Sequence, residues 1–202
     1  LSLCNKNLKN INNIDSDKAR HNLLVDVCMA ANYEAQSLIR YHDQYQEKYG
    51  DSKICTMLAR SFADIGDIVR GKDLYLGNKK KSENKREKEK LEENFKKYFQ
   101  QIHEDVTNGK KGEIETRYKD TENYFQLRED WWNANRATVW KAITCSKKLN
   151  NSAYFRTTCN SADGRGEAQA NHYCRCNGDN PDKDMVNIDP PTYFDYVPQY
   201  LR

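Results

Sequence analysis

The sequence has little of the residues that interrupt helices. It contains only four prolines and nine glycines in 202 residues, and no proline lies between Ile11 and Ile143. Long helices are therefore permitted over this stretch, because an internal proline removes a hydrogen bond and clashes with the preceding turn. No run of about 18 apolar residues is present either, so we expect no direct membrane insertion. No signal peptide is expected, because Leu1–Leu8 is short and contains Lys6.

An excess of charge of one sign is also missing. The 33 basic and 30 acidic residues give a net charge of +3, which is too balanced to predict a nucleic-acid partner. Apolar residues make up only 37% of the chain, whereas tyrosine occurs 13 times. The core must therefore use amphipathic aromatic side chains, whose polar atoms need hydrogen-bond partners when buried.

Groupings typical of catalysis are missing as well. The four histidines lie in separate segments, and none has a serine or cysteine nearby in a recognised nucleophile turn. The stretch Gly164–Gly166 is too short for a phosphate-binding loop and precedes no apolar helix. We therefore expect a binding module rather than an enzyme, with no cofactor and no metal.

Apolar residues recur at intervals of three and four, which predicts an all-α fold. We expect helices over 19–42, 53–70, 84–106 and 121–143, with Gly71 as the C-terminal cap of the second. In the last of them Trp131 and Trp132, with Trp140, are expected in the core, on a wide apolar surface that also includes Phe125. The charged residues Arg128, Asp130 and Arg136 should be paired, because an unpaired buried charge costs about 3–5 kcal/mol. After Pro190-Pro191, an aromatic tail is expected to begin a further helix.

Seven cysteines occur, and four of them fall in a segment poor in aliphatic residues: Cys145, Cys159, Cys174 and Cys176. Such a segment lacks the apolar side chains for a core of its own, so we predict disulfides among these four. Zinc is the alternative, but the close pair is C-x-C beside His172, without a second knuckle. Cys174 and Cys176 should bridge to different partners, because alternate residues of an extended chain point in opposite directions. Cys28 and Cys55 could bridge their two helices or remain buried thiols.

A charge run from Lys79 to Lys111 carries eleven basic and seven acidic residues, an excess of four positive charges. Clustered cations attract a sulfated polysaccharide, which carries closely spaced negative charges. The alternative is a solvated helix face with pairs such as Glu92–Lys96. A second basic group lies around Lys147, Lys148, Arg156 and Arg165. The candidate glycan-binding residues of the run are Lys79, Lys80, Lys81, Lys85, Arg86, Lys88, Lys110 and Lys111.

Several blocks resemble one protein family. They are YEAQSLI (Tyr33–Ile39), ARSFADIGDIVRGKDLYLG (Ala59–Gly77), LREDWWNANRATVWKAITC (Leu127–Cys145), CRC (Cys174–Cys176) and PPTYFDYVPQYLR (Pro190–Arg202). In this order they resemble the alpha-class Duffy-binding-like domain of the variant erythrocyte membrane proteins of Plasmodium falciparum. The resemblance covers most of residues 20–202.

This resemblance implies a helical domain of three subdomains braced by disulfides. Residues 1–78 would then be the end of subdomain one and residues 79–202 subdomain two, with the third subdomain missing. It also implies host-cell adhesion from the extracellular face of the infected erythrocyte membrane, as part of a larger anchored protein. The implied partners are heparan sulfate-type glycans, blood-group sugars or a host receptor, together with adjacent domains of the same adhesin. The alternative is a structural head module that supports receptor binding by an adjacent cysteine-rich interdomain region.

Overall fold

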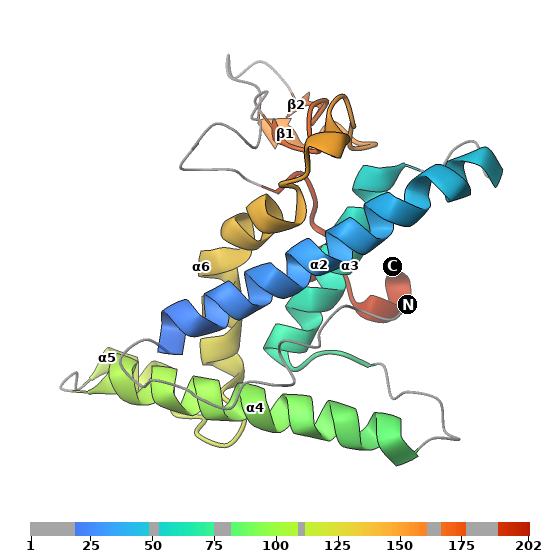
Figure 1. Ribbon diagram of the computed structural model, residues 1–202. Helices are drawn as coiled ribbons and strands as arrows, with labels where there is room; N and C mark the ends of the chain where they lie inside the picture. The colour runs from blue at the N-terminus through green and yellow to red at the C-terminus, as the bar shows by residue number, and fades with distance from the viewer. Residues whose placement is uncertain (1–18, 49–52, 75–81, 109–111, 161–166, 177–189) are drawn as a thin grey trace.

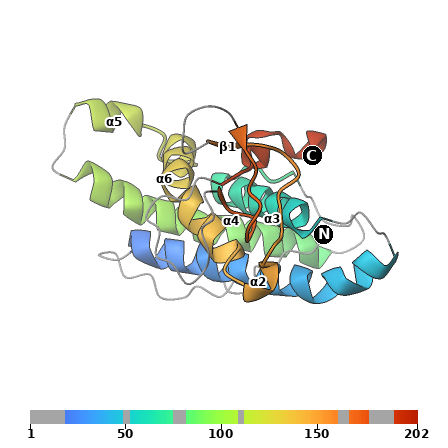
Figure 2. The same ribbon diagram turned by 90° about the horizontal axis from the view of Figure 1, so that it is seen from above.

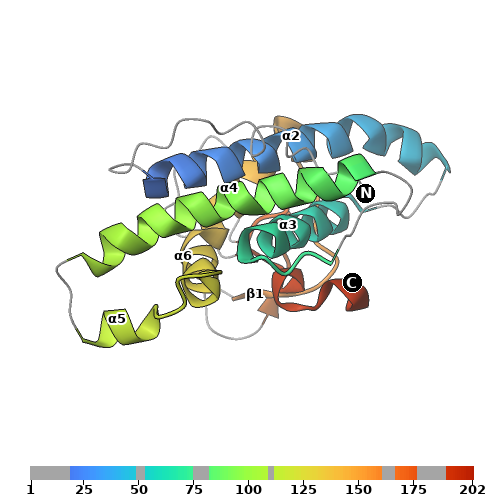
Figure 3. The ribbon, with the colours of Figure 1, turned by 90° about the horizontal axis from the view of Figure 1, so that it is seen from below.

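The computed structural model describes residues 19–48, 53–74, 82–108, 112–160, 167–176 and 190–202. The long elements of this part are α2 (Ala19–Lys48), α3 (Ile54–Arg70), α4 (Ser82–Thr107) and α6 (Phe125–Ile143), and a single turn, α5 (Glu113–Arg117), precedes α6. Helices α2, α3 and α6 pack against one another, and α4 lies across one end of this group (Figure 1, Figure 3). The all-α fold predicted from the sequence is confirmed.

Three tryptophans of α6 hold the helices together. Trp132 and Trp140 are fully buried, and Phe62 of α3 packs on both, with ring centroids 5.1 and 5.2 Å away. Trp131, also buried, meets Phe99 of α4 edge-on with centroids 6.2 Å apart. The predicted core position of the tryptophans is confirmed. Because one helix contacts α3 and α4 through successive rings, a single core spans both sides of the boundary expected between residues 78 and 79.

Helix α3 ends where the sequence predicts. Gly71 adopts a left-handed conformation with φ of 73°, its N–H donates to the Ile68 carbonyl at 3.1 Å, and the Lys72 N–H donates to the Asp67 carbonyl at 2.8 Å. This is the hydrogen-bond pattern of a Schellman cap. Arg128 of α6 completes the cap, because its guanidinium donates to the carbonyls of Ile68 and Val69.

The charged residues inside α6 are paired, as expected. Arg128 binds Glu92 of α4 through two hydrogen bonds of 2.5 and 3.0 Å. Arg117 binds Asp130 through two bonds of 2.8 Å, which lowers the pKa of the Asp130 carboxyl. Arg136 binds Asp195 in the segment that follows the two prolines.

Several element boundaries differ from the prediction. Helix α2 continues to Lys48 instead of ending at residue 42, and α6 begins at Phe125 instead of 121. The side chain of Phe125 is 50% exposed, so its assignment to the core is wrong. The aromatic tail forms two short 3₁₀ turns, η4 (Phe194–Tyr196) and η5 (Gln199–Leu201), and not the start of an α-helix. Pro198 separates the turns, because it has no N–H to continue a helical ladder.

The segment after α6 is irregular. It contains a 3₁₀ turn, η2 (Lys147–Leu149), and a short antiparallel pair, β1 (Cys159–Asn160) with β2 (Glu167–Ala168). In the view from above, β1 and the C-terminal turns lie at the edge of the helices opposite α2 (Figure 2). Hydrogen bonds between distant backbone groups, such as Tyr154 N–H to the Ala170 carbonyl at 2.8 Å, fix its path.

Two disulfides brace this segment. Cys159 bonds to Cys176 within it, and Cys174 bonds to Cys55 of α3. Cys174 and Cys176 thus have different partners, but the expected disulfide at Cys145 is wrong. Cys145 is a free, exposed thiol that accepts a hydrogen bond from the Asn32 amide at 2.7 Å. Cys55 bonds to Cys174 in place of Cys145. The start of α3, where Cys55 is buried, lies against this segment, whereas Cys145 lies at the surface just after the end of α6.

Candidate functional site

Most of the predicted glycan-binding residues fall where the structure gives no side-chain description. Lys79, Lys80, Lys81, Lys110 and Lys111 lie outside the described residues. Lys85 and Arg86 lie on the first turns of α4, but nothing is described of their side chains. Lys88 is partly buried and donates from Nζ to the Asp73 carbonyl at 2.8 Å. Lys88 therefore attaches α4 to the connection after α3.

Helix α4 changes character along its length, as the sequence predicts. Glu89 and Lys90 are exposed, whereas Leu91, Phe95, Tyr98, Phe99 and Ile102 are buried. Glu92 is held by the fully buried Arg128 of α6. The expected pair of Glu92 with Lys96 is therefore replaced by a contact between α4 and α6. The Glu92 carboxylate of the charge run is thus neutralised by the Arg128 guanidinium.

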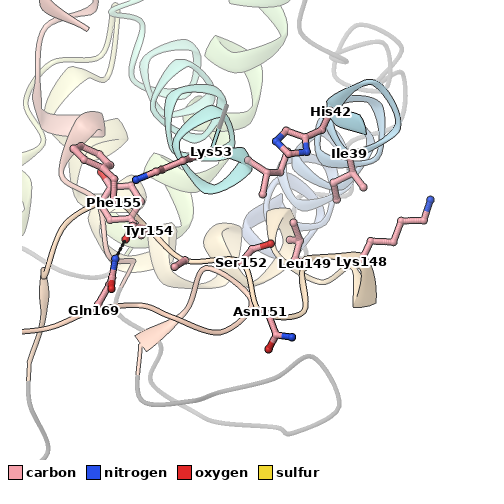
Figure 4. A pocket seen from close by; sticks show the side chains of 12 residues that line it. Ile39, His42, Lys53, Lys148, Leu149, Asn151, Ser152, Tyr154, Phe155 and Gln169 are labelled. Atoms are coloured by element: carbon pink, nitrogen blue, oxygen red, sulfur yellow. Dashed lines mark hydrogen bonds between the residues drawn. The ribbon is translucent and has the colours of Figure 1, made fainter. Parts of the chain in front are cut away.

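A second basic feature is a hollow of about 590 Å³, which we name the α2–α3 hollow. Its walls are the end of α2, the start of α3 and the irregular segment after α6, and its lining comprises Ile39, His42, Lys53, Ile54, Lys148, Leu149, Asn151, Ser152, Ala153, Tyr154, Phe155 and Gln169. His42 and Ile39 lie on one side of it, with Ser152 and Leu149 facing them (Figure 4). Pockets of about 300–1,000 Å³ are the usual size for small ligands.

The ends of the α2–α3 hollow carry positive charge. Lys53 extends toward Tyr154 and Phe155, and Lys148 extends at the opposite end (Figure 4). No aspartate or glutamate occurs among the described residues that line the hollow. The electrostatics of this lining therefore favour an anionic ligand over a cationic one.

Several of the residues that line the hollow are apolar. Ile39, Ile54 and Leu149 are buried, and the Phe155 ring packs on Tyr154 with centroids 4.8 Å apart while remaining 37% exposed. The Gln169 amide donates to the Tyr154 carbonyl at 2.7 Å, which holds this part of the chain. The hollow thus offers an exposed aromatic face beside charged and uncharged polar groups.

The sequence only partly indicated this site. Lys148 and Arg156 belong to the second basic group noted above, and Arg156 lies over the Phe155 ring at 5.1 Å. Lys53 and His42 were not singled out as binding residues, because they belong to other helices. Nothing in the local sequence signals that they line the same hollow as Lys148. In the part of the chain that the structure describes, no group of three or more His, Cys, Asp or Glu side chains could hold a metal ion.

Comparisons with known proteins identify the family to which this chain belongs. The family model described as the Duffy binding domain matches residues 1–202. The chain belongs to the Duffy-binding domain family. The recognition made from the residue blocks is thereby confirmed, and Duffy-binding domains of this kind are adhesion modules and not enzymes. A search of curated proteins finds no match.

Solved structures of other Duffy-binding-like domains have the same fold. The chain is 36% identical to the NTS-DBL1(alpha-1) domain of Plasmodium falciparum membrane protein 1 (PfEMP1), with a TM-score of 0.69. The match covers 98% of this chain and 39% of that one. It is 35% identical, with a TM-score of 0.69, to the Plasmodium falciparum double domain of NTS-DBL1-alpha and CIDR-gamma, covering 98% of this chain and 25% of that one. A PfEMP1 DBLb domain bound to human ICAM-1 is 27% identical, with a TM-score of 0.60, and the match covers 98% and 36% of the two chains.

The Duffy-binding chain described here therefore spans less than half the length of these relatives. Among its described residues, none of the helices is both long and apolar enough to cross a membrane. Family membership supports a receptor-binding role, whereas the α2–α3 hollow and the charge run are features of this chain's own residues.

Proposed function

We propose that this chain is part of a host-cell adhesion domain, displayed outside the infected erythrocyte, that binds sulfated glycans through the start of α4. The finding that carries the proposal is the contact of Glu92 with the buried Arg128. Because α6 neutralises this carboxylate, the lysines of the run retain more of their excess positive charge. Sulfated chains of the heparan type are the ligand class that this arrangement fits, and attachment to red cells through such chains or blood-group sugars would produce rosetting.

Relatives support the general role. A related PfEMP1 domain forms a complex with human ICAM-1, so the fold presents surfaces for host receptors. That receptor is not carried over to this chain, because the same fold supports different binding sites. The charge run gives the proposal its own chemical basis.

Heparin affinity chromatography tests the proposal. A variant in which Lys79, Lys80, Lys81 and Lys85 are replaced by glutamine should elute from heparin at lower salt, because fewer cations face the sulfates. Lys88 is kept, since its ammonium group binds the Asp73 carbonyl. The matched control removes four exposed cations elsewhere: Arg40, Arg60, Lys119 and Lys147. Equal elution of the run variant and the parent would exclude the start of α4 as the heparin site.

A second function follows from another relative. The double-domain structure joins a Duffy-binding-like domain to a CIDR domain, which favours a head module that supports its neighbour. In that case the isolated chain should show no glycan affinity above that of the control variant. Host-cell binding would then require the adjacent cysteine-rich domain, which a comparison of single- and double-domain proteins would reveal.

A further inference from the structure

We infer that the α2–α3 hollow binds a short acidic oligosaccharide, an inference that rests on the proposed adhesion function and adds a second glycan site to it. The hollow is formed by residues outside the charge run. Its lining combines cations, an exposed aromatic ring and neutral polar side chains. Each of these groups recognises a different part of a sugar chain that carries a carboxylate or a sulfate.

The cations select the charge of the ligand and its length. Lys53 and Lys148 extend at opposite ends of the hollow (Figure 4), so an extended ligand satisfies both better than a single small anion does. A hydrogen bond from a charged donor contributes more to binding than one from a neutral donor. Among the described lining residues none is acidic, so none of them offers a carboxylate to the two ammonium groups in place of the ligand.

Phe155 supplies the apolar contact. Its ring contacts Tyr154, with centroids 4.8 Å apart, and the guanidinium of Arg156 lies 5.1 Å from the ring centroid, while the side chain remains 37% exposed. A pyranose ring has one face made largely of C–H groups, and an exposed aromatic ring can bury that face while the hydroxyl groups stay at the polar rim. Asn151 and Ser152, which precede Phe155 by a few residues, also line the hollow, and their side chains can form hydrogen bonds with those hydroxyl groups.

The disulfide Cys55–Cys174 fixes the two walls relative to each other. Cys55 follows Ile54 in the α3 wall, and the N–H of Cys174 donates to the Ser152 carbonyl in the opposite wall at 3.0 Å. The Ser152 N–H in turn donates to the Leu149 carbonyl at 3.0 Å. A site whose walls are already held loses less conformational freedom when a ligand binds. Reduction of this disulfide should therefore weaken binding in the hollow.

Titration of the isotopically labelled full chain, followed by NMR, tests the inference. The probes are 3′-sialyllactose for the carboxylate, lactose 3′-sulfate for the sulfate, and lactose for the neutral sugar. At least one acidic probe should shift the amide signals of residues 53–54 and 148–155, and the stronger of the two identifies the anionic group. Lactose should bind at least tenfold more weakly, because it lacks the charge that meets the lysines.

Three variants connect the signal to the hollow. Lys53→Gln and Lys148→Gln should each weaken the acidic probe about tenfold, through loss of a charged hydrogen bond. Lys147→Gln is the matched control, since Lys147 is also exposed and is adjacent to Lys148 but is not among the residues that line the hollow. It should change the affinity less than twofold. Lactose binding as tightly as the acidic probes, no shift at these residues, or equal losses in all three variants would overturn the inference.

The same protein samples separate this inference from the proposed function. The α4 run variant should lose heparin retention while keeping its affinity for the acidic probe. The Lys53→Gln and Lys148→Gln variants should keep heparin retention while losing affinity for the acidic probe. Unchanged heparin retention in the run variant, together with probe binding at the hollow, would overturn only the proposal for α4.

Discussion

Arg136 of α6 and Asp195 of η4 form a two-point ion pair, with Nε to Oδ2 at 2.8 Å and Nη2 to Oδ1 at 2.9 Å. The Asp195 side chain is fully buried, and its Oδ2 also accepts a hydrogen bond from Trp132 Nε1 at 2.9 Å. Arg70 of α3 donates to the Asp195 backbone carbonyl. One residue of the C-terminal segment thus satisfies buried polar groups from two helices, which attaches the aromatic tail to the core.

Removing the Asp195 carboxylate should destabilise the fold strongly. Asp195→Ala removes the only carboxylate that pairs with the Arg136 guanidinium among the described residues, which leaves it the Thr192 carbonyl at 2.9 Å, and it leaves the Trp132 indole N–H without its acceptor. We therefore expect a loss of about 3–5 kcal/mol in the free energy of unfolding. Urea denaturation measures this loss. The control is Asp130→Ala, because Arg117 is 54% exposed in its pair with Asp130, and a loss of about 1 kcal/mol or less is expected there. Equal losses in the two variants would contradict a buried role for Asp195.

Gly66 is required by the position of Trp132. A Cβ atom at residue 66 would lie 2.7 Å from Cζ2 of the Trp132 indole, which is fully buried and cannot move aside. Gly66→Ala should therefore cost about 1–3 kcal/mol through overpacking. In a Trp132→Phe background the smaller ring leaves room, so the same substitution should cost less. A double-mutant cycle measured by urea denaturation gives this coupling, and strictly additive effects would show that the two residues are not in contact.

The cysteines should separate by reactivity and by pairing. Peptide mapping without reduction should recover Cys55 linked to Cys174 and Cys159 linked to Cys176. Iodoacetamide at neutral pH should label Cys145 much faster than Cys28. Cys145 is exposed, whereas burial raises the pKa of the Cys28 thiol to about 11 and so suppresses its reactive thiolate. Fast labelling of Cys28, or Cys145 recovered in a bridge with a described cysteine, would contradict the structure.

Asp120 should stabilise the start of α6 in a pH-dependent way. Backbone N–H groups of Asn123, Phe125 and Glu122 donate to its carboxylate, and these hydrogen bonds lower the pKa of Asp120. Asp120→Ala should cost about 1 kcal/mol at pH 7, as for other caps. A lowered pKa means that this stabilisation is complete above the unfolded value of about 3.9 and is lost as the pH falls through the folded pKa. Urea denaturation at pH 7 and pH 3 should show the difference between parent and variant shrinking in acid.

The local features of the fold could be predicted from the sequence. The spacing of apolar residues predicts α3 within one residue of its observed start, and Gly71 ends it as a left-handed cap. The three tryptophans are buried because large apolar surfaces at helical spacing leave water wherever a second helix can cover them. The blocks around Ala59–Gly77 and Leu127–Cys145 were sufficient to recognise the family. These results depend on residues within a few turns of one another.

The pairing of distant residues was decided by the tertiary structure alone. Cys55 and not Cys145 bonds to Cys174, and Asp195 pairs with Arg136, because the irregular segments fold back onto α3 and α6. Phe125 is exposed although its spacing places it among the apolar residues of α6. The α2–α3 hollow likewise has Lys53, at the start of α3, and Lys148, in the segment after α6, in one lining. Periodicity states which face of a helix is apolar, but which partner covers that face depends on the path of the whole chain.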